Sequence, residues 1–176
     1  MTSILKVDNI QNSSGTSAMS IDSNGVVKQP ALPSFKVHGG TNVGSKLDLT
    51  SATWTDVPFG TADWNTGSHY DTTNFRFKPT VAGIWWLRAG AYFTYGSDAP
   101  SQQFLSFYDE GGNELLRERR QSTDSSTYGI MTVSGIFNMS GNGTDWIEVQ
   151  CYVGDSNDTD VYYGELYGGF QGYLIG

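Results

Sequence analysis

The sequence has few of the residues on which enzymes, disulfide-linked proteins and nucleic-acid-binding proteins depend. Its one cysteine, Cys151, allows no disulfide within the chain. It has 10 Lys and Arg against 18 Asp and Glu, and the net charge of −8 leaves no basic surface for nucleic acid. A hydrolytic triad or metal site using both histidines, His38 and His69, would need them in one place. The chain has no run long enough to insert into a membrane and does not open on a secretory signal, so we expect a protein folded in a cytoplasm.

What the sequence does contain is the composition of short strands joined by tight turns. It has 22 glycines and 14% aromatic residues, and only 16% of its residues are charged. The one basic cluster, Arg117, Arg119 and Arg120, is interpreted as solvent-facing positions of a strand. Helical periodicity is absent, so the pattern predicts an antiparallel sandwich, jelly roll or barrel, with Cys151 in its core and a possible bulge at Gly135. The predicted strands cover residues 35–38, 54–57, 75–78, 83–93, 103–108, 114–121, 128–139, 146–153 and 169–175.

Residues 1–33 differ from the rest and are interpreted as an extended N-terminal arm. Their apolar residues are isolated among Ser, Asn and Asp, which is too little to build a core. Asn24-Gly25 between two short β-forming pieces predicts a hairpin, and Pro30 and Pro33 mark the junction with the domain at 34–176. The arm is therefore either disordered or buried against identical arms or another protein.

An ordered set of residues in the larger domain resembles a known family. The set comprises Asn65, Gly67, Tyr70, Asp71, Phe77, Pro79, Ala82, Gly83 and Trp85, followed at the end of the chain by Phe170, Gly172 and Tyr173. This order and spacing resembles the heads of the complement C1q and tumour-necrosis-factor (TNF) superfamily over residues 34–176. The resemblance implies an all-β, ten-stranded antiparallel jelly-roll sandwich and a homotrimer that buries edge strands and aromatic side chains around a three-fold axis. Within it we expect Phe77, Trp85 and Tyr173 in the core.

The arm carries a second resemblance. Residues 5–11, 19–27 and 29–35 resemble the leader that precedes such heads in structural proteins of marine tailed bacteriophages, cyanophages included. Together the two resemblances predict a homotrimeric virion protein, a tail-fibre tip, knob or capsid-associated fibre, made in the host cytoplasm. The arm would trimerise or anchor the head to other virion proteins, and the head would mediate adhesion to a host-surface glycan or protein. Two alternatives stay open: a secreted C1q/TNF-like or lectin-like binding module, and a glycan-degrading enzyme on a β scaffold.

The sequence offers no catalytic, cofactor-binding or nucleic-acid-binding motif. Adjacent carboxylates at 109–110 lie in a predicted turn and are a poor acid–base pair. One acidic loop could supply oxygen ligands to calcium, through Asp155, Asp158 and Asp160, although a solvated loop is the favoured interpretation. Three loops that mix Tyr with small polar residues are candidate receptor contacts. Their representative residues are Tyr95, Asp98, Gln102, Tyr128 and Tyr162.

Overall fold

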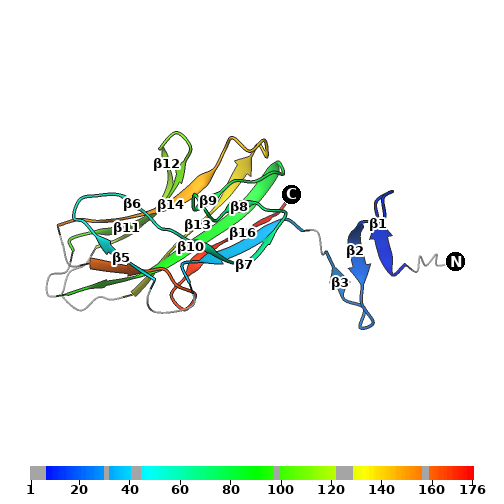
Figure 1. Ribbon diagram of the computed structural model, residues 1–176, viewed down its shortest axis with the longest axis horizontal. Helices are drawn as coiled ribbons and strands as arrows, with labels where there is room; N and C mark the ends of the chain where they lie inside the picture. Colours follow the sequence, from blue (N-terminus) through cyan, green and yellow to red (C-terminus); the bar gives the residue numbers. More distant parts are fainter. Residues whose placement is uncertain (1–6, 30–31, 41–44, 97–99, 122–128, 156–158) are drawn as a thin grey trace.

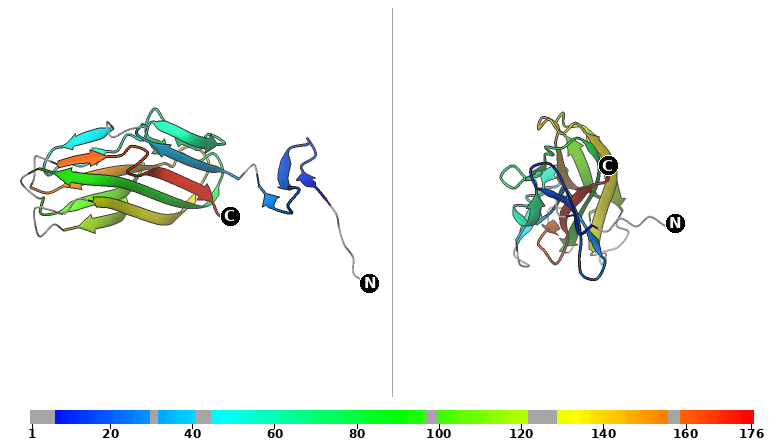
Figure 2. Two further views of the ribbon diagram at one scale, coloured as in Figure 1. Left: turned by 90° about the horizontal axis from the view of Figure 1, so that it is seen from below. Right: turned by 90° about the vertical axis from the view of Figure 1, so that its right-hand side faces the viewer.

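A computed structural model describes residues 7–29, 32–40, 45–96, 100–121, 129–155 and 159–176. Every regular element in these ranges is a β-strand, and no helix there is long and apolar enough to cross a membrane. Two sheets face each other as a sandwich from residue 32 onward, while the arm forms a small sheet of its own (Figures 1 and 2). The prediction of an all-β chain is confirmed.

The larger sheet of the head has seven strands and is built around the long strand β10. β10 pairs with β13 along one edge, and with β16 and then β15 along the other. From there β16 leads to β4 and β7, and β15 leads to β5, all by antiparallel pairing. The strands are β4 (Ser34–His38), β5 (Lys46–Leu49), β7 (Thr61–Thr66), β10 (Gly83–Tyr95), β13 (Gly129–Met139), β15 (Thr159–Tyr162) and β16 (Gly169–Leu174).

The smaller sheet of the head has six strands in the order β12-β11-β14-β9-β8, with β6 also paired to β14. The turn between β11 and β12 is the predicted hairpin: the Asp109 carboxylate accepts hydrogen bonds from the backbone N–H groups of Gly111 and Asn113, at 2.9 and 2.8 Å. The strands are β6 (Thr55–Asp56), β8 (Tyr70–Asp71), β9 (Arg76–Phe77), β11 (Gln103–Asp109), β12 (Glu114–Arg120) and β14 (Ile147–Val153).

The core lies between the two sheets and is dominated by aromatic rings. Phe35 of β4 stacks on Tyr70 and Phe77, at centroid distances of 5.3 and 5.1 Å, and meets the edge of Phe170 at 5.0 Å. Such stacked and edge-to-face pairs stabilise a core beyond the area they bury. Cys151 is fully buried as predicted, and burial raises the pKa of its thiol.

The motif around position 65 has a structural explanation. The Asn65 side chain donates to the Tyr70 carbonyl oxygen at 2.8 Å and accepts from the Tyr70 N–H at 3.1 Å, which closes the turn between β7 and β8. Gly67 sits in that turn at φ +84°, where a Cβ atom would meet His69 Nε2 at 2.5 Å. His69 is buried against Trp85, and its Nδ1 accepts from the Thr80 N–H at 3.2 Å.

The later motif positions also serve packing. Pro79 is buried after β9, and Gly83 begins β10 at φ +144°. Phe170 is fully buried among the core rings. A Cβ atom on Gly172 would meet Leu87 Cδ2 at 2.4 Å and Phe35 Cε1 at 2.8 Å, so the closing strand needs glycine there.

Three expectations about the head need correction or are not confirmed. Gly135 makes no bulge, because β13 pairs with β10 in unbroken register from Gly83 to Phe93; instead a Cβ atom there would crowd Phe137 and Leu116. Tyr173 is 44% exposed and lies outside the core. Side chains alternate along β16, and Phe170 and Gly172 occupy its inward positions, so Tyr173 points outward. The count of ten strands is not confirmed, since the head is divided into the segments β4–β16.

Candidate association and binding surfaces

The outward side of the seven-stranded sheet carries many large apolar side chains. Alternation along β10 sends Trp85, Leu87, Ala89, Ala91 and Phe93 inward, and their neighbours outward. We call this outward side the aromatic face. It comprises Trp64, Ile84, Trp86, Arg88, Tyr92, Ile130, Ile136, Tyr162, Leu166, Tyr167 and Tyr173.

Cross-strand pairing arranges the aromatic face in rows. Ile136, Trp86 and Tyr173 are direct neighbours on β13, β10 and β16, and the rings of Trp86 and Tyr173 lie 5.2 Å apart. Ile136 is 65% exposed and Tyr173 is 44% exposed, while Trp86 between them is half-buried; Trp64 on β7 is 48% exposed. A groove lined by Leu32, Trp64, Trp86 and Tyr173 runs over β4 between these rings. Few monomeric soluble proteins leave a contiguous patch of this kind open to water.

A polar row with a hollow beside it interrupts the aromatic face. Arg88, Gln171 and Lys36 are cross-strand neighbours on β10, β16 and β4. Lys36 pairs with Asp63 at 2.5 Å, which lowers the pKa of that carboxyl. Arg88 has no ion pair within the described ranges, although it is exposed and lines the hollow together with Glu165. The hollow has a volume of about 180 Å³ and a floor of glycines at 90, 168 and 169.

The outward side of the six-stranded sheet has a different character. Trp54 contacts the rings of Phe104, Tyr108 and Tyr152 at centroid distances of 5.9, 5.2 and 5.1 Å. The guanidinium of Arg117 lies 4.4 Å above the Phe104 ring and pairs with Glu114 on its own strand. The predicted basic cluster therefore covers aromatic side chains as well as facing solvent.

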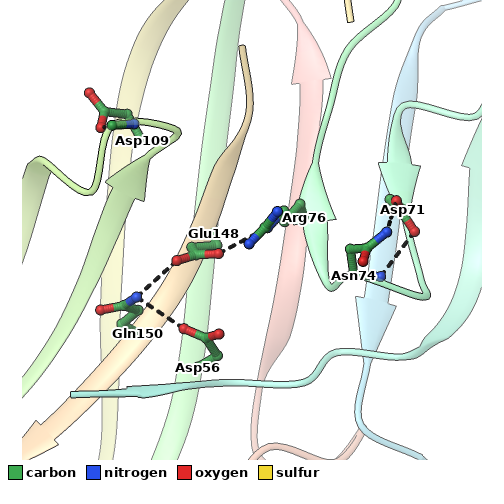
Figure 3. Close-up of polar contacts among 8 residues, drawn as sticks. Asp56, Asp71, Asn74, Arg76, Asp109, Glu148 and Gln150 are labelled. Carbon is green, nitrogen blue, oxygen red and sulfur yellow. Dashed lines mark hydrogen bonds and ion pairs between the residues drawn. The ribbon is translucent and has the colours of Figure 1, made fainter. Parts of the chain in front are cut away.

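A polar ladder crosses the same sheet beside this cluster. Figure 3 shows Gln150 between Glu148 and Asp56: its Nε2 donates to Glu148 Oε1 at 2.8 Å and to Asp56 Oδ1 at 3.0 Å. Arg76 Nε bonds the other Glu148 oxygen at 3.1 Å, and its guanidinium lies 3.8 Å above the ring of Trp146. Both carboxylates thus accept hydrogen bonds from protein donors. This arrangement stabilises strand pairing.

The described strand ends that flank the three candidate receptor loops lie at one end of the head, where Tyr95 pairs with Thr159 and Gln103 pairs with Arg120 and Val153. Tyr95 is only 4% exposed on β10, so its side chain packs inward and leaves the candidate set. Tyr162 lies on β15 within the aromatic face, where its ring contacts Tyr92 and Tyr167. Gln102 is half-buried before β11. Asp98 and Tyr128 lie outside the described residues.

The calcium candidates are engaged with protein groups where the structure describes them. Asp155 accepts from the Ser101 N–H at 2.8 Å, and Asp160 pairs with Lys46 at 3.1 Å. Asp158 lies outside the described residues. No three His, Cys, Asp or Glu side chains gather at metal-binding distance in the described ranges. The calcium hypothesis therefore stays a prediction.

The two histidines occupy separate structural positions. His69 is enclosed in the core as described above, and burial lowers its pKa. His38 ends β4, where its Nε2 lies 3.2 Å from Asp63 and its Nδ1 accepts from the Gly40 N–H at 2.9 Å. The family resemblance implied aromatic side chains around a three-fold axis, but the sequence did not identify the residues of the aromatic face. Its signal was the pair Trp85-Trp86, which places a large ring on each side of one strand.

Comparison with known proteins rests on structure alone. No protein-family model and no curated protein sequence matches the chain. Among solved structures, the globular domain of zebrafish complement 1qA is 14% identical, with a TM-score of 0.59 over 82% of this chain and 98% of that one. Eiger TNF from S. frugiperda is 14% identical, with a TM-score of 0.61 over 83% and 94%. Murine APRIL is 16% identical, with a TM-score of 0.58 over 81% and 97%. The head of this chain therefore has the antiparallel jelly-roll fold of the C1q and TNF heads.

Proposed function

We propose that the chain is a homotrimeric, non-enzymatic binding module that serves as a structural protein of a bacteriophage virion. The observation that carries the trimer is the aromatic face, on which the exposed Ile136 and Tyr173 flank the half-buried Trp86 in one cross-strand row. Identical copies cover such a face by closed symmetry, and the resemblance to C1q and TNF heads favours three of them. Arg88, left without an ion pair in the described ranges, would then meet a carboxylate of a neighbouring copy.

The test of the trimer is sedimentation equilibrium of the full chain with two matched variants. Ile136→Asp adds a charge to the aromatic face at a side chain that is 65% exposed, so the single head should still fold. Thr53→Asp adds the same charge at an exposed turn before β6. We expect a species of about three times the 19.2-kDa chain mass for the wild type and Thr53→Asp, and dissociation for Ile136→Asp. A wild-type chain that stays monomeric at all concentrations would overturn the trimer.

The virion role rests on the resemblance of the arm and on the combination of an arm with a display head. Three copies of a head present any weak contact three times, which raises the avidity for a cell surface. Antibody against the chain should label purified phage particles, and labelled protein should bind host cells. If the chain is missing from purified particles, the virion role is lost.

A second candidate is a secreted C1q/TNF-like or lectin-like binding module. The similarity to the heads of zebrafish complement 1qA and murine APRIL favours it, because both are animal proteins with this fold. Secretion of the native chain by its own cells, with no chain in phage particles, would select this candidate. A glycan-degrading enzyme would be shown by release of reducing sugar that is lost in Glu148→Gln.

A further inference from the structure

The N-terminal arm is a three-stranded antiparallel sheet with one apolar side. Its strands are β1 (Asn9–Gln11), β2 (Ser17–Ile21) and β3 (Val27–Lys28), in the order β1-β2-β3. Ile10 is directly opposite Met19, and Ile21 is directly opposite Val27. Because Met19 and Ile21 are two residues apart on β2, all four side chains share one side of the sheet, which we call the arm face.

Two similar turns set the register of this sheet. In the first, the Asn12 side chain accepts from the Ser14 and Thr16 N–H groups, and Gly15 is at φ +83°. In the second, the Asp22 side chain accepts from the Asn24 and Val26 N–H groups at 2.9 and 3.0 Å, and Gly25 is at φ +79°. An Asx residue followed three positions later by glycine therefore closes both hairpins. The local sequence thus specifies the sheet and the side on which its apolar residues lie.

Among the residues that the structure describes, the arm face is left largely open within one copy of the chain. Ile10, Ile21 and Val27 are 50%, 40% and 55% exposed. The arm is also shorter than the roughly 40 residues below which a unit usually needs disulfides, metals or oligomerisation to fold. Whatever makes the arm sheet stable must therefore cover these side chains.

Identical arms are the partner that the chain itself provides. Residues 1–33 carry Lys6, Lys28, Asp8 and Asp22, so the arm is neutral and the whole net charge of −8 belongs to the head. Copies of the arm therefore have no net electrostatic repulsion between them. A strongly charged partner would likewise gain no net electrostatic attraction from the arm. The chain also leaves the head beside the aromatic face: Pro33 accepts from the Leu174 N–H at 3.0 Å, and Leu32 lines the groove with Trp64 and Trp86. Heads that associate through that face bring their arms together at high effective concentration.

We infer that the arm faces of three copies pack against one another and form a second, separate β core ahead of the heads. This inference rests on the proposed trimer, because the heads supply the local concentration that three short sheets need. The arms then order only in the assembled protein, and the polar side with Asn9, Ser20 and Lys28 stays outward. Contacts to another macromolecule would fall to that polar side.

The first experiment is amide hydrogen exchange on the full chain, with a double substitution on each side of the arm. Ile10→Ser/Ile21→Ser removes apolar side chains from the arm face, while Asn9→Ser/Ser20→Thr changes the opposite side of the same two strands. We expect the β1–β3 amides to exchange at least tenfold faster in the first variant than in the wild type, and unchanged in the second. Head amides and the sedimenting mass should not change in either.

The second experiment is crosslinking between copies, which reports directly on the arm face. Met19→Cys places a thiol on the arm face and Ser20→Cys places one on the polar side, and the one native thiol, Cys151, is fully buried. We expect Met19→Cys to form crosslinked chains at least tenfold faster than Ser20→Cys under mild oxidation. The arm core would be overturned if Met19→Cys and Ser20→Cys crosslink at equal rates and the arm amides of the wild type exchange as fast as those of Ile10→Ser/Ile21→Ser. A head trimer observed by sedimentation would be unaffected by that result. A chain that is monomeric in solution would overturn both the head trimer and the arm core. The head variant Ile136→Asp tests the contact between heads separately from the arm.

Discussion

Gly172 offers the sharpest test of how the closing strand packs. It lies on β16 opposite Leu87, and a Cβ atom there would fall 2.4 Å from Leu87 Cδ2 and 2.8 Å from Phe35 Cε1. Neither neighbour can retreat, because both are fully buried and Phe35 is held between Tyr70, Phe77 and Phe170. Inserting a methyl group into a packed core costs about 1–3 kcal/mol. Replacing glycine by alanine in a strand returns about 0.5–1 kcal/mol of that.

The difference between the central values of these two effects is a net loss of about 1.3 kcal/mol in the free energy of unfolding for Gly172→Ala. The matched control is Gly90→Ala on the neighbouring strand β10, where the Cβ atom would lie 3.5 Å from the Met131 carbonyl oxygen and Thr132 Oγ1, an ordinary contact. Urea unfolding followed by tryptophan fluorescence compares both with the wild type at one protein concentration, because association makes stability concentration-dependent. If Gly172→Ala is as stable as the wild type, or Gly90→Ala loses as much, the packing argument is wrong.

Two further predictions concern the turn between β7 and β8. Asn65→Ala removes both hydrogen bonds to the Tyr70 backbone and should cost about 1–3 kcal/mol in urea unfolding, whereas Asn74→Ala, on an exposed turn, should cost less than about 1 kcal/mol. His69 gives a pH dependence: burial lowers its pKa below the ordinary 6.5, so the unfolded chain binds the proton first and stability falls as pH drops from 7 through 6.5 toward the folded pKa. The urea midpoint should therefore fall less between pH 7 and pH 5.5 in His69→Gln than in the wild type, and parallel curves would contradict this role.

The sequence was sufficient for those parts of the fold that local chemistry determines. The Asn24-Gly25 hairpin and the turn at 109–113 were predicted because glycine at positive φ and Asx side chains act within a few residues. β10, β11 and β14 were predicted because their apolar residues alternate or run together over seven residues or more. The resemblance to the C1q and TNF heads, which implied this fold, rested on glycine and aromatic positions, and the structure gives the packing reason for Gly67 and Gly172.

Strands that owe their conformation to a neighbour were missed. β7 has one large apolar side chain, Trp64, and it points outward, so the segment shows no core-facing alternation. β15 follows a stretch of sequence rich in Asp and Asn. Its residues form a strand because they pair with β10 on one side and β5 on the other. β5 carries Lys46 and Asp48, whose ion pair forms on the outward side of the sheet. Pairing partners far along the chain are not readable from such short polar segments.

The aromatic face shows what a single strand could have revealed. In β10 the sequence Gly-Ile-Trp-Trp-Leu places Trp85 and Trp86 on opposite sides, and Ile84 joins Trp86 while Leu87 joins Trp85. A strand that is apolar on both sides is typical of a sheet covered on both sides. Within one copy only the side of Trp85 is covered, by the six-stranded sheet, while Trp86 lies in the groove with Trp64 and Tyr173. The same reasoning applies to the arm, where Ile10, Met19 and Ile21 alternate with polar residues and face no second layer within the described part of the chain. In both parts of the chain the proposed trimer would cover these apolar side chains, and this is why the oligomeric state is the property to measure before any ligand is sought.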